Sequence, residues 1–279
     1  VPALAVLLAA CGEGEPLTPP DAVLPDGGRY RGAIVDGRLQ GPGRMDYPSG
    51  SWYEGPFKNG QAHGQGRWHS AQGDNYTGEF ERGEFHGQGT LIYRDGTRYE
   101  GGFKLGRLHG EGNLKQSGLS YRGGFANDKY QGPGKLVSPD GSSFQGRFTA
   151  GEPDGEGLRR DAEGNQYSGR FVHGHLEGEG SYTGADGSHY TGGFAKNAFD
   201  GRGRYQSSDG EVWTGAFKGG ELQGTGEYHG DDGSHYQGEF NHWRYHGQGK
   251  LRHADGRVYQ GQFDHGEYSG VGTLTWPDG

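Results

Sequence analysis

The chain has 279 residues, of which 62 are glycine and 12 are proline. Such a composition is typical of disorder unless the glycines follow a period, and Leu, Ile, Val and Phe form only about 15% of the chain, too little for an ordinary two-layer core. The 17 tyrosines, 13 phenylalanines and 5 tryptophans argue against disorder, because disordered chains are poor in aromatic residues. The formal net charge of -9 argues against a nucleic-acid partner. The single cysteine, Cys11, excludes an internal disulfide framework and a cysteine-based zinc site.

Residues 1–11, VPALAVLLAAC, form an uncharged apolar run that is too short to span a bilayer and is typical of the end of a secretory signal peptide. The LAAC motif that ends at Cys11 resembles the bacterial lipobox, in which the leader is cut before a cysteine that is then acylated. The resemblance implies that Cys11 is the lipidation site and that Gly12 directs the protein to the outer membrane, facing the periplasm. Because the chain opens on Val1 and lacks a basic segment before Cys11, we expect it to begin inside its own leader. The alternative is an apolar terminus with an incidental cysteine.

Residues 12–28, GEGEPLTPPDAVLPDGG, are rich in proline, glycine and acidic residues. This composition predicts a tether that extends to about 50 Å at about 3.1 Å per residue. We therefore expect three segments: the signal end in residues 1–11, the tether in 12–28 and a repeat array in 29–279.

The array is defined by an aromatic-x-Gly pattern that recurs every 23 residues, with one step of 22. Counted from that aromatic residue, the third, twelfth and fourteenth places of each unit are glycine, and the fifth is phenylalanine except for Ile34 in the first unit. The glycines are therefore periodic, which excludes the low-complexity interpretation. The aromatic residues that open the eleven units are Tyr30, Tyr53, Tyr76, Tyr99, Tyr121, Phe144, Tyr167, Tyr190, Trp213, Tyr236 and Tyr259.

Each unit is predicted to be a β-hairpin. In YEGGF, starting at Tyr99, aromatic residues alternate with polar or small ones, as expected of a half-buried strand. Gly106 allows the chain to reverse, and residues 108–114 run back. The unit closes at Asp95-Gly96 or its equivalent, for which we predict a two-residue turn. Because glycine inside strands often marks close approach of another group, we expect the aromatic rings to lie across the glycine columns, with Gly101 and Gly110 both required.

The pattern YxGxFxxGxxHGxG…DGxx resembles the MORN repeat over residues 30–279. The resemblance implies an all-β fold: an elongated single-sheet solenoid of consecutive antiparallel β-hairpins. It also implies association with membranes, lipid contact and self-association, so a protein partner and a homodimer are expected in addition to the lipid-anchored membrane. The array ends at Gly279 in a turn, and we expect further sequence beyond it because repeat arrays normally protect their open edges.

No catalytic or cofactor site is predicted in these residues. No GxxxxGK[ST] phosphate loop occurs. The eleventh place holds His63, His86, His109 and His246 but other polar residues elsewhere, which favours a hydrogen-bonding role over catalysis. Equivalent histidines of successive units would lie about 10 Å apart, too far for one zinc ion. His173-Gly174-His175 is a weak copper or nickel candidate, and the acids of the Asp-Gly turns are expected to form turns rather than bind calcium.

The predicted function is a lipid-anchored scaffold of the bacterial cell envelope that mediates protein–protein or protein–membrane association. One alternative comes from resemblance to envelope proteins in which a lipobox and MORN units precede a legumain-like cysteine peptidase, so that these residues would position an enzyme. The other is a glycan-binding module, for which Trp68, Trp243 and Trp276 are the residues to test, because they lie outside the main aromatic columns.

Overall fold

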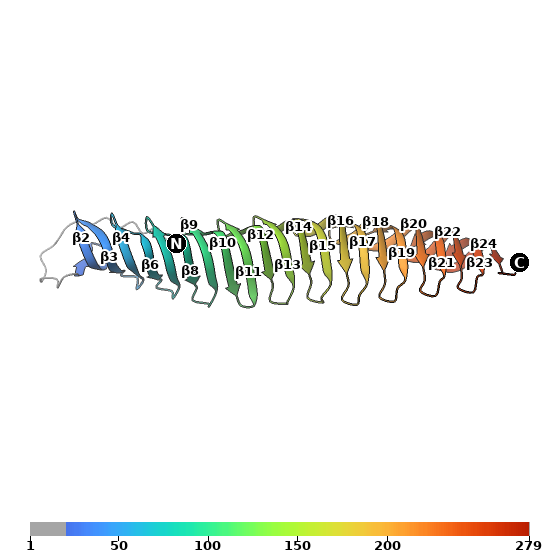
Figure 1. Cartoon of the computed structure of the whole chain (residues 1–279), viewed down its shortest axis with the longest axis horizontal. Helices are drawn as coiled ribbons and strands as arrows, with labels where there is room; N and C mark the ends of the chain where they lie inside the picture. Colours follow the sequence, from blue (N-terminus) through green and yellow to red (C-terminus); the bar gives the residue numbers. More distant parts are fainter. Residues whose placement is uncertain (1–20, 279) are drawn as a thin grey trace. The chain divides into compact units, whose positions relative to one another are not determined.

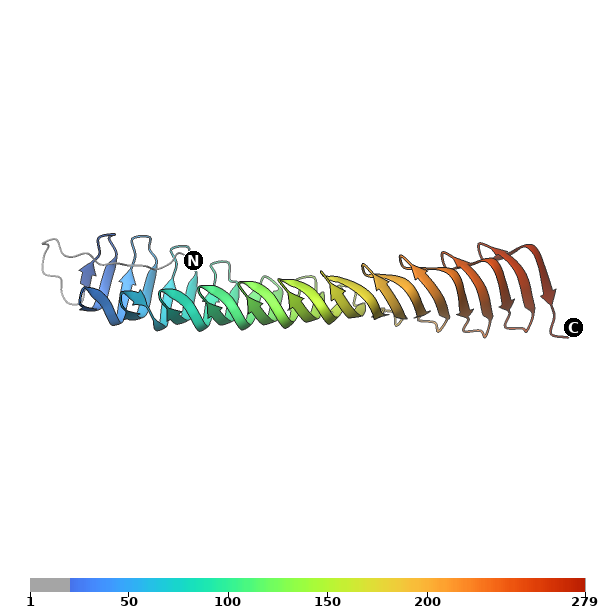
Figure 2. The ribbon, with the colours of Figure 1, turned by 90° about the horizontal axis from the view of Figure 1, so that it is seen from above.

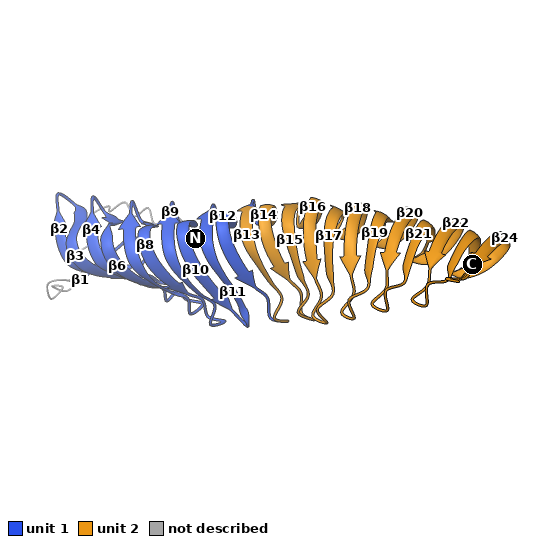
Figure 3. Cartoon of the chain, turned by 45° about the vertical axis from the view of Figure 1, so that its right-hand side comes forward, with its two compact units in different colours: residues 1–139, 149–151 blue, residues 140–148, 152–279 orange. Residues whose placement is uncertain are grey.

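The computed structural model describes residues 21–278, which form β-strands, turns and loops and contain no helix. The chain divides into two compact units, shown in different colours in Figure 3. Unit 1 contains the described residues up to Pro139 together with Thr149–Gly151, and unit 2 contains Asp140–Phe148 and the described residues from Glu152 onward. Cys11 and the predicted signal segment lie outside the described residues. Within residues 21–278 no helix is long and apolar enough to cross a membrane.

Figure 1 labels the strands in chain order. The strands of unit 1 are β1 (Asp21–Val23), β2 (Arg29–Val35), β3 (Arg38–Asp46), β4 (Trp52–Lys58), β5 (Gln61–Ala62), β6 (Gly64–His69), β7 (Asn75–Glu81), β8 (Glu84–Ile92), β9 (Arg98–Lys104), β10 (Arg107–Gln116), β11 (Leu119–Ala126) and β12 (Lys129–Val137). The strands of unit 2 are β13 (Ser143–Thr149), whose last residue belongs to unit 1, β14 (Glu152–Arg160), β15 (Gln166–Val172), β16 (His175–Thr183), β17 (His189–Ala195), β18 (Ala198–Gln206), β19 (Val212–Lys218), β20 (Glu221–His229), β21 (His235–Asn241), β22 (Arg244–Arg252), β23 (Val258–Asp264) and β24 (Glu267–Thr275).

Within each unit the strands are antiparallel and pair with their neighbours in sequence. In unit 1, for example, β9 pairs with β8 and β10, and in unit 2 β21 pairs with β20 and β22. Figure 2 shows the strands of each unit side by side and bent along their length. These observations confirm the predicted all-β fold of consecutive antiparallel hairpins.

The array begins before the predicted boundary at residue 29. Strand β1 pairs with β2, with Asp21 opposite Arg31 and Val23 opposite Arg29, and the side chain of Leu24 is buried. Residues 21–28, which the composition assigned to the tether, therefore form a strand and the turn that leads into β2.

Each 23-residue repeat has two turns, and they differ. The two-residue turn that the sequence predicts at Asp95-Gly96 lies instead at the other turn, between β9 and β10. Between β9 and β10 only Leu105 and Gly106 connect the paired ends, and both have positive φ, of 51° and 74°, as a type I′ turn requires. Between β8 and β9 five residues separate Ile92 from its partner Arg98. Gly96 there donates its N–H to the Tyr93 carbonyl at 2.9 Å and has φ of 84°. The Asp-Gly segment is thus part of a five-residue loop, not a two-residue turn.

The one 22-residue step has a local explanation. Strands β10 and β11 are joined by Ser117 and Gly118 alone, because Gln116 pairs directly with Leu119. Both turn residues have positive φ, of 35° and 87°. A two-residue turn therefore replaces the longer loop at this point, and the next unit begins one residue earlier.

A bulge follows the turn in the second strand of each hairpin. In β10 the pairing with β9 shifts between Leu108, opposite Phe103, and Gly112, opposite Gly101. Gly110 lies in this bulge with φ of 75°, and a Cβ atom there would meet nothing within 4 Å. The expectation that Gly110 lies beneath a ring was therefore wrong: this position requires glycine for its left-handed backbone.

In nine of the eleven repeats the aromatic residue that opens the repeat lies over glycines, as predicted. A Cβ atom on Gly112 would lie 2.5 Å from Cε2 of Tyr99, and one on Gly101 would lie 2.6 Å from its hydroxyl oxygen. The ring is fully buried, and its hydroxyl donates to the Gly102 carbonyl at 2.9 Å. The same seating over two glycines occurs at Tyr30, Tyr53, Tyr76, Tyr121, Phe144, Tyr190, Tyr236 and Tyr259.

The rings of successive hairpins contact one another, so the core continues from one 23-residue repeat to the next within each compact unit. Tyr99 meets Phe103 of its own strand at a centroid distance of 5.1 Å and Phe125 of the next hairpin at 5.0 Å, both edge to face. Edge-to-face pairs at such distances are favourable beyond the area they bury. A chain poor in aliphatic residues therefore forms a core from one face of an open sheet.

Two 23-residue repeats in unit 2 depart from the ring-over-glycine arrangement. At Gly169 and Gly215 the nearest side chains are Leu176 and Leu222, at 3.0 and 2.8 Å from an added Cβ atom. The rings of Tyr167 and Trp213 are only partly buried and pack instead on neighbouring rings, Tyr182 at 5.1 Å and Tyr228 at 5.0 Å respectively. A leucine occupies the place of the ring in both repeats.

Candidate functional site

The face of the sheet opposite the buried rings carries the polar side chains, and in unit 1 this face is hollowed into a groove. Side chains alternate between the two faces along a strand, so the residues on either side of each central glycine point away from the rings. The groove has a volume of about 670 Å³. We call it the unit 1 groove; its lining residues are Arg31, Gly32, Pro42, Gly43, Arg44, Glu54, Gly55, Pro56, Gln65, Gly66, Arg67 and Thr77.

Three arginines line the groove, and two of them approach the same acid. Arg44 bonds to Asp46 at 2.7 Å and lies 3.7 Å from Glu54, and Arg67 lies 3.9 Å from Glu54. The bond to Asp46 raises the pKa of Arg44 above its ordinary value. The side chain of Arg67 is 64% exposed, so its ion pair is weak. The groove and its surroundings thus hold three guanidinium groups and two carboxylates, those of Asp46 and Glu54, and an anionic ligand would compete with these acids for the guanidinium donors.

An aromatic ring lies beside these charges. The Arg44 guanidinium sits 4.5 Å from the centre of the Trp52 ring, a cation–π distance. The Trp52 ring also stacks with the imidazole of His69, its partner on β6, at a centroid distance of 5.8 Å and an interplanar angle of 20°. The three residues come from β3, β4 and β6, which the pairing of Asp46 with Trp52 and of Trp52 with His69 holds in register. The ring is therefore oriented by contacts on both sides.

Two prolines contribute apolar surface to the groove. Pro42 and Pro56 are direct cross-strand partners in β3 and β4. Because proline has no backbone N–H, neither leaves an unused donor in the lining. The Pro56 carbonyl accepts hydrogen bonds from the Tyr53 hydroxyl and from the His63 amide, both at 2.9 Å. The lining thus combines apolar proline rings with charged side chains.

Unit 2 has a hollow at the same place in its repeats, but with different chemistry. A volume of about 600 Å³ is lined mainly by Thr225, Glu227, Gln237, Lys250 and neighbouring glutamines and glycines. The positions equivalent to Arg44 and Arg67 hold Glu227 and Lys250. The repeat therefore supplies the same hollow in both units, and the side chains decide what each can bind.

A second hollow of unit 1 lies on the aromatic side of the sheet. Its lining includes Trp68, Phe85, Leu91, Leu108 and Tyr93 together with Asp74 and Asp128. Both acids already serve the fold. Asp128 accepts the Leu108 amide at 2.8 Å and Asp74 accepts the Arg94 amide at 3.0 Å.

The histidines of the eleventh place do not form a shared site. His86 lies 3.3 Å from Glu81 and His246 lies 3.4 Å from Asp264. The candidate pair His173 and His175 is divided between different partners, Glu152 at 3.2 Å and Asn197 at 2.8 Å. The structure does not bring these two side chains together around one ion.

The acids of the Asp-Gly loops form turns, as predicted. Asp95 and Asp186 accept the amides of Thr97 and Ser188 at 2.8 and 2.9 Å. In Asp186 the hydrogen bonds from the Ser188 hydroxyl and amide hold the pKa below its ordinary value.

Of the tryptophans proposed as glycan contacts, two are packed. Trp68 contacts Phe85 at 5.4 Å, and Trp243 contacts Phe217 at 5.4 Å. Trp276 is 55% exposed and lies under the Arg257 guanidinium at 5.3 Å.

Two groups of residues were not found from the sequence. The groove residues of unit 1 occupy variable places of the repeat, so no single motif marks them. His229 and His235 flank the loop GDDGS and pair directly across β20 and β21. The sequence carries a signal for this pair, because residues that flank a hairpin loop symmetrically become cross-strand neighbours, whereas the spacing between equivalent places of successive repeats does not reveal it.

Eleven segments of the chain match the model of the MORN repeat, which are residues 30–52, 53–75, 76–98, 99–116, 121–143, 144–166, 167–189, 190–212, 213–235, 236–256 and 259–279. The chain belongs to the MORN-repeat family. In nine of the eleven repeats of this MORN array the glycines of the third and fourteenth places lie beneath the opening ring. The unmatched residues between 116 and 121 contain the shortened turn at Ser117 and Gly118.

No curated protein matches the MORN array. Among solved structures, it is similar to the TCP10 domain of Danio rerio CPAP, with 15% identity and a TM-score of 0.38 over 70% of this chain and 93% of that one. The same domain in complex with a peptide of Danio rerio STIL is 14% identical, with a TM-score of 0.34 over 91% of this chain and 97% of that one. The SAS-4 TCP domain of Drosophila melanogaster, in complex with a proline-rich motif of Ana2, is 14% identical, with a TM-score of 0.34 over 56% of this chain and 85% of that one.

Proposed function

We propose that this MORN array is a scaffold that binds an extended, acidic segment of a partner protein in the unit 1 groove. The observation that carries the proposal is the combination of Arg31, Arg44 and Arg67 with Trp52 and a proline pair on one hollowed face. Tryptophan and arginine are the residues that most often dominate the binding energy of protein interfaces. Their orientation by neighbouring strands reduces the entropy lost on binding.

The shape of the groove sets the length of the ligand. Its lining comes from β2, β3, β4, β6 and β7. Five strands at a spacing of about 4.8 Å span about 19 Å, which accommodates about six residues of extended chain. A partner segment with two or three acidic residues within six positions would place its carboxylates near the guanidinium groups, where charge-assisted hydrogen bonds form.

The test uses the full chain and a fluorescent peptide of alternating glutamate and proline that is long enough to cross the groove. We expect saturable binding that weakens as salt is raised, because the charges are exposed. Arg44→Glu and Arg67→Glu should each weaken binding roughly tenfold, since they place like charges across the interface. Lys250→Glu is the matched control, because it changes the equivalent place of a unit 2 repeat. Equal weakening by the control, or no saturable binding, would contradict the proposal.

We further propose that the scaffold is held in the bacterial cell envelope by a lipid on Cys11, at the outer membrane facing the periplasm. Support comes from the sequence: an apolar run, the LAAC motif and Gly12 after the cysteine. Two or three acyl chains bind a membrane stably without help from the folded part. A Cys11→Ser variant expressed with a complete leader should leave the membrane fraction; a variant that stays there would reject the anchor.

A further inference from the structure

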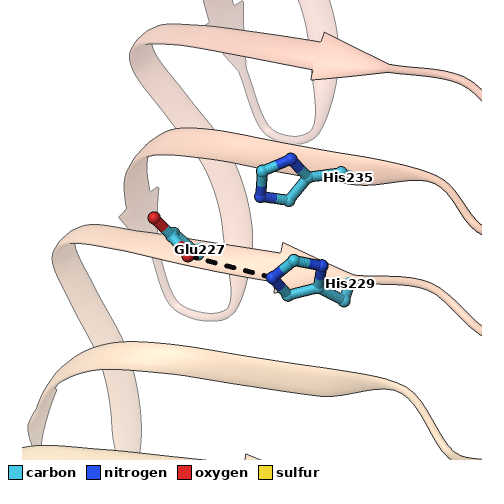
Figure 4. Close-up of side chains that lie close together, drawn as sticks. All are labelled: Glu227, His229 and His235. Atoms are coloured by element: carbon cyan, nitrogen blue, oxygen red, sulfur yellow. Dashed lines mark ion pairs between the residues drawn. The ribbon is translucent and has the colours of Figure 1, made fainter.

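Three metal-binding side chains meet at the base of one loop in unit 2. Glu227 and His229 lie two residues apart in β20 and therefore point to the same face, and His235 opens β21 as the direct partner of His229. One ligand atom from each of the three side chains lies within 4.8 Å of the other two. Figure 4 shows both imidazole rings beside the carboxylate, with a ring nitrogen of each turned toward it.

The side chains are already partly positioned. The two rings stack at 4.3 Å with an angle of 13°, and Nε2 of His229 lies 3.8 Å from the Glu227 carboxylate. The amide of Gln237 donates to the other carboxylate oxygen at 3.2 Å. Nε2 of His235 is buried yet has no hydrogen-bond partner. An unpartnered buried nitrogen beside a carboxylate and a second imidazole is unfavourable for the protein alone.

We propose that Glu227, His229 and His235 bind one zinc ion. Zinc ligands at about 2.0 to 2.1 Å from the ion lie about 3.3 Å apart in a tetrahedral site. The ligand atoms lie within 4.8 Å of one another. The most distant pair must therefore move closer by up to about 1.5 Å to reach the zinc geometry. Rotation of the two exposed side chains accomplishes this, because Glu227 and His229 are 42% and 53% exposed.

The donor set decides the class of metal. Two imidazoles with one carboxylate suit zinc and similar transition metals, whereas magnesium and calcium require oxygen ligands. Three protein ligands leave a fourth position open to water or to a side chain of a partner. The hydrogen bond from Gln237 to Glu227 is the kind of outer contact that orients a metal-binding carboxylate.

The corresponding places of other hairpins have a different composition. His189 faces Thr183, with Nδ1 and the hydroxyl oxygen 3.2 Å apart, and His69 faces Asn75 with a contact of 2.9 Å. Each of these imidazoles already has a polar partner. Within residues 21–278 the Glu227 group is the one set of three such ligands that lies this close together.

Two cations lie next to the site and must weaken it. On the neighbouring strand β22, Arg252 pairs with His235 and Lys250 pairs with Gln237. Because a positive charge disfavours a bound cation, Arg252→Gln should tighten zinc binding. Substitution of a ligand should lower the zinc affinity, whereas this variant should raise it. General damage to the fold would not raise the affinity.

The experiment titrates the full chain with zinc against a chromophoric chelator at neutral pH. We expect one site per chain, with affinity weakened at least tenfold in His229→Gln and in His235→Gln and strengthened in Arg252→Gln. His189→Gln is the matched control, because it removes an imidazole at the equivalent place of another hairpin, and it should bind as the parent does. Cobalt provides an independent readout, since its visible absorption reports imidazole coordination and should disappear with His235→Gln.

Circular dichroism keeps the result interpretable. His229 is exposed, so its substitution should leave the melting curve of the zinc-free chain unchanged. Unchanged zinc affinity in folded His229→Gln and His235→Gln would overturn the proposal, and so would an equal loss in His189→Gln.

Discussion

The hydroxyl of Tyr99 donates a hydrogen bond to the carbonyl oxygen of Gly102, three residues ahead in the same strand, at 2.9 Å. That carbonyl lies where the bulge of β10 interrupts the pairing between β9 and β10. The ring therefore fills the space above two glycines while its hydroxyl donates to a carbonyl beside the bulge. This explains why tyrosine, rather than phenylalanine, opens most units.

Replacing Tyr99 with phenylalanine should destabilise the array by about 1 kcal/mol, because one buried hydrogen bond is lost while the packing is kept. The reverse change is available at Phe144, which lies over Gly146 and Gly157 in the same way. Phe144→Tyr should stabilise the chain, by about 1 kcal/mol. Urea unfolding followed by circular dichroism measures both. Opposite shifts of the unfolding midpoint support the account, and a midpoint unchanged by Tyr99→Phe contradicts it.

Gly110 and Gly112 should respond differently to substitution. Gly110 has φ of 75° and open space around its Cα, whereas Gly112 lies directly beneath the Tyr99 ring. Gly110→Ala should cost about 1 to 2 kcal/mol from the left-handed backbone, and Gly110→Asn should cost less because asparagine tolerates this conformation. At Gly112 asparagine should be worse than alanine, since the larger side chain meets the ring. Melting temperatures of the four variants decide; the same order at both positions would contradict the assignment.

Much of this fold was predictable from the sequence, because the alternation in YEGGF and the fixed glycines specify strands, register and the ring-over-glycine contact. The turn types were not. Leu105 adopts positive φ in the two-residue turn, although a branched side chain disfavours it, whereas the more suitable Asp95-Gly96 lies in a longer loop. Here the pairing of the flanking strands overrides local preference. The zinc ligands required the register across β20 and β21, and the unit 1 groove required knowledge of which variable residues share a face.

The buried tyrosines make the array sensitive to alkali. Burial raises the pKa of Tyr190 and of Tyr236 to about 12, against about 10 in an unfolded chain. The folded pKa is the higher one, so the stabilisation is complete below about pH 10 and is lost as the pH rises from about 10 to about 12. Urea midpoints should therefore be constant up to about pH 9 and fall steeply above about pH 10. Tyr190→Phe should reduce that slope, and an equal slope would exclude a contribution from this ring.

The loop acids make a weaker contribution at the opposite end of the pH scale. Hydrogen bonds from Ser188 depress the pKa of Asp186, and those from Ser234 depress the pKa of Asp232. A depressed folded pKa means that the stabilisation is present above the unfolded value of about 3.9 and is lost as the pH falls through the folded value. The melting temperature should therefore drop below about pH 4. In Asp186→Asn the drop should be smaller, and an undiminished drop would assign the acid sensitivity to other groups.

A ring seated over backbone without side chains forms the core of this MORN array, and a double-mutant cycle on Tyr99 and Gly112 measures the energy of that contact. Gly112→Ala should destabilise the parent chain by about 1 to 3 kcal/mol, because the added methyl group meets the ring. In a Tyr99→Ala background the ring is absent, so the same substitution should cost much less, and the coupling free energy from urea unfolding should exceed about 1 kcal/mol. A coupling of zero, with Gly112→Ala equally costly in both backgrounds, would contradict the claim.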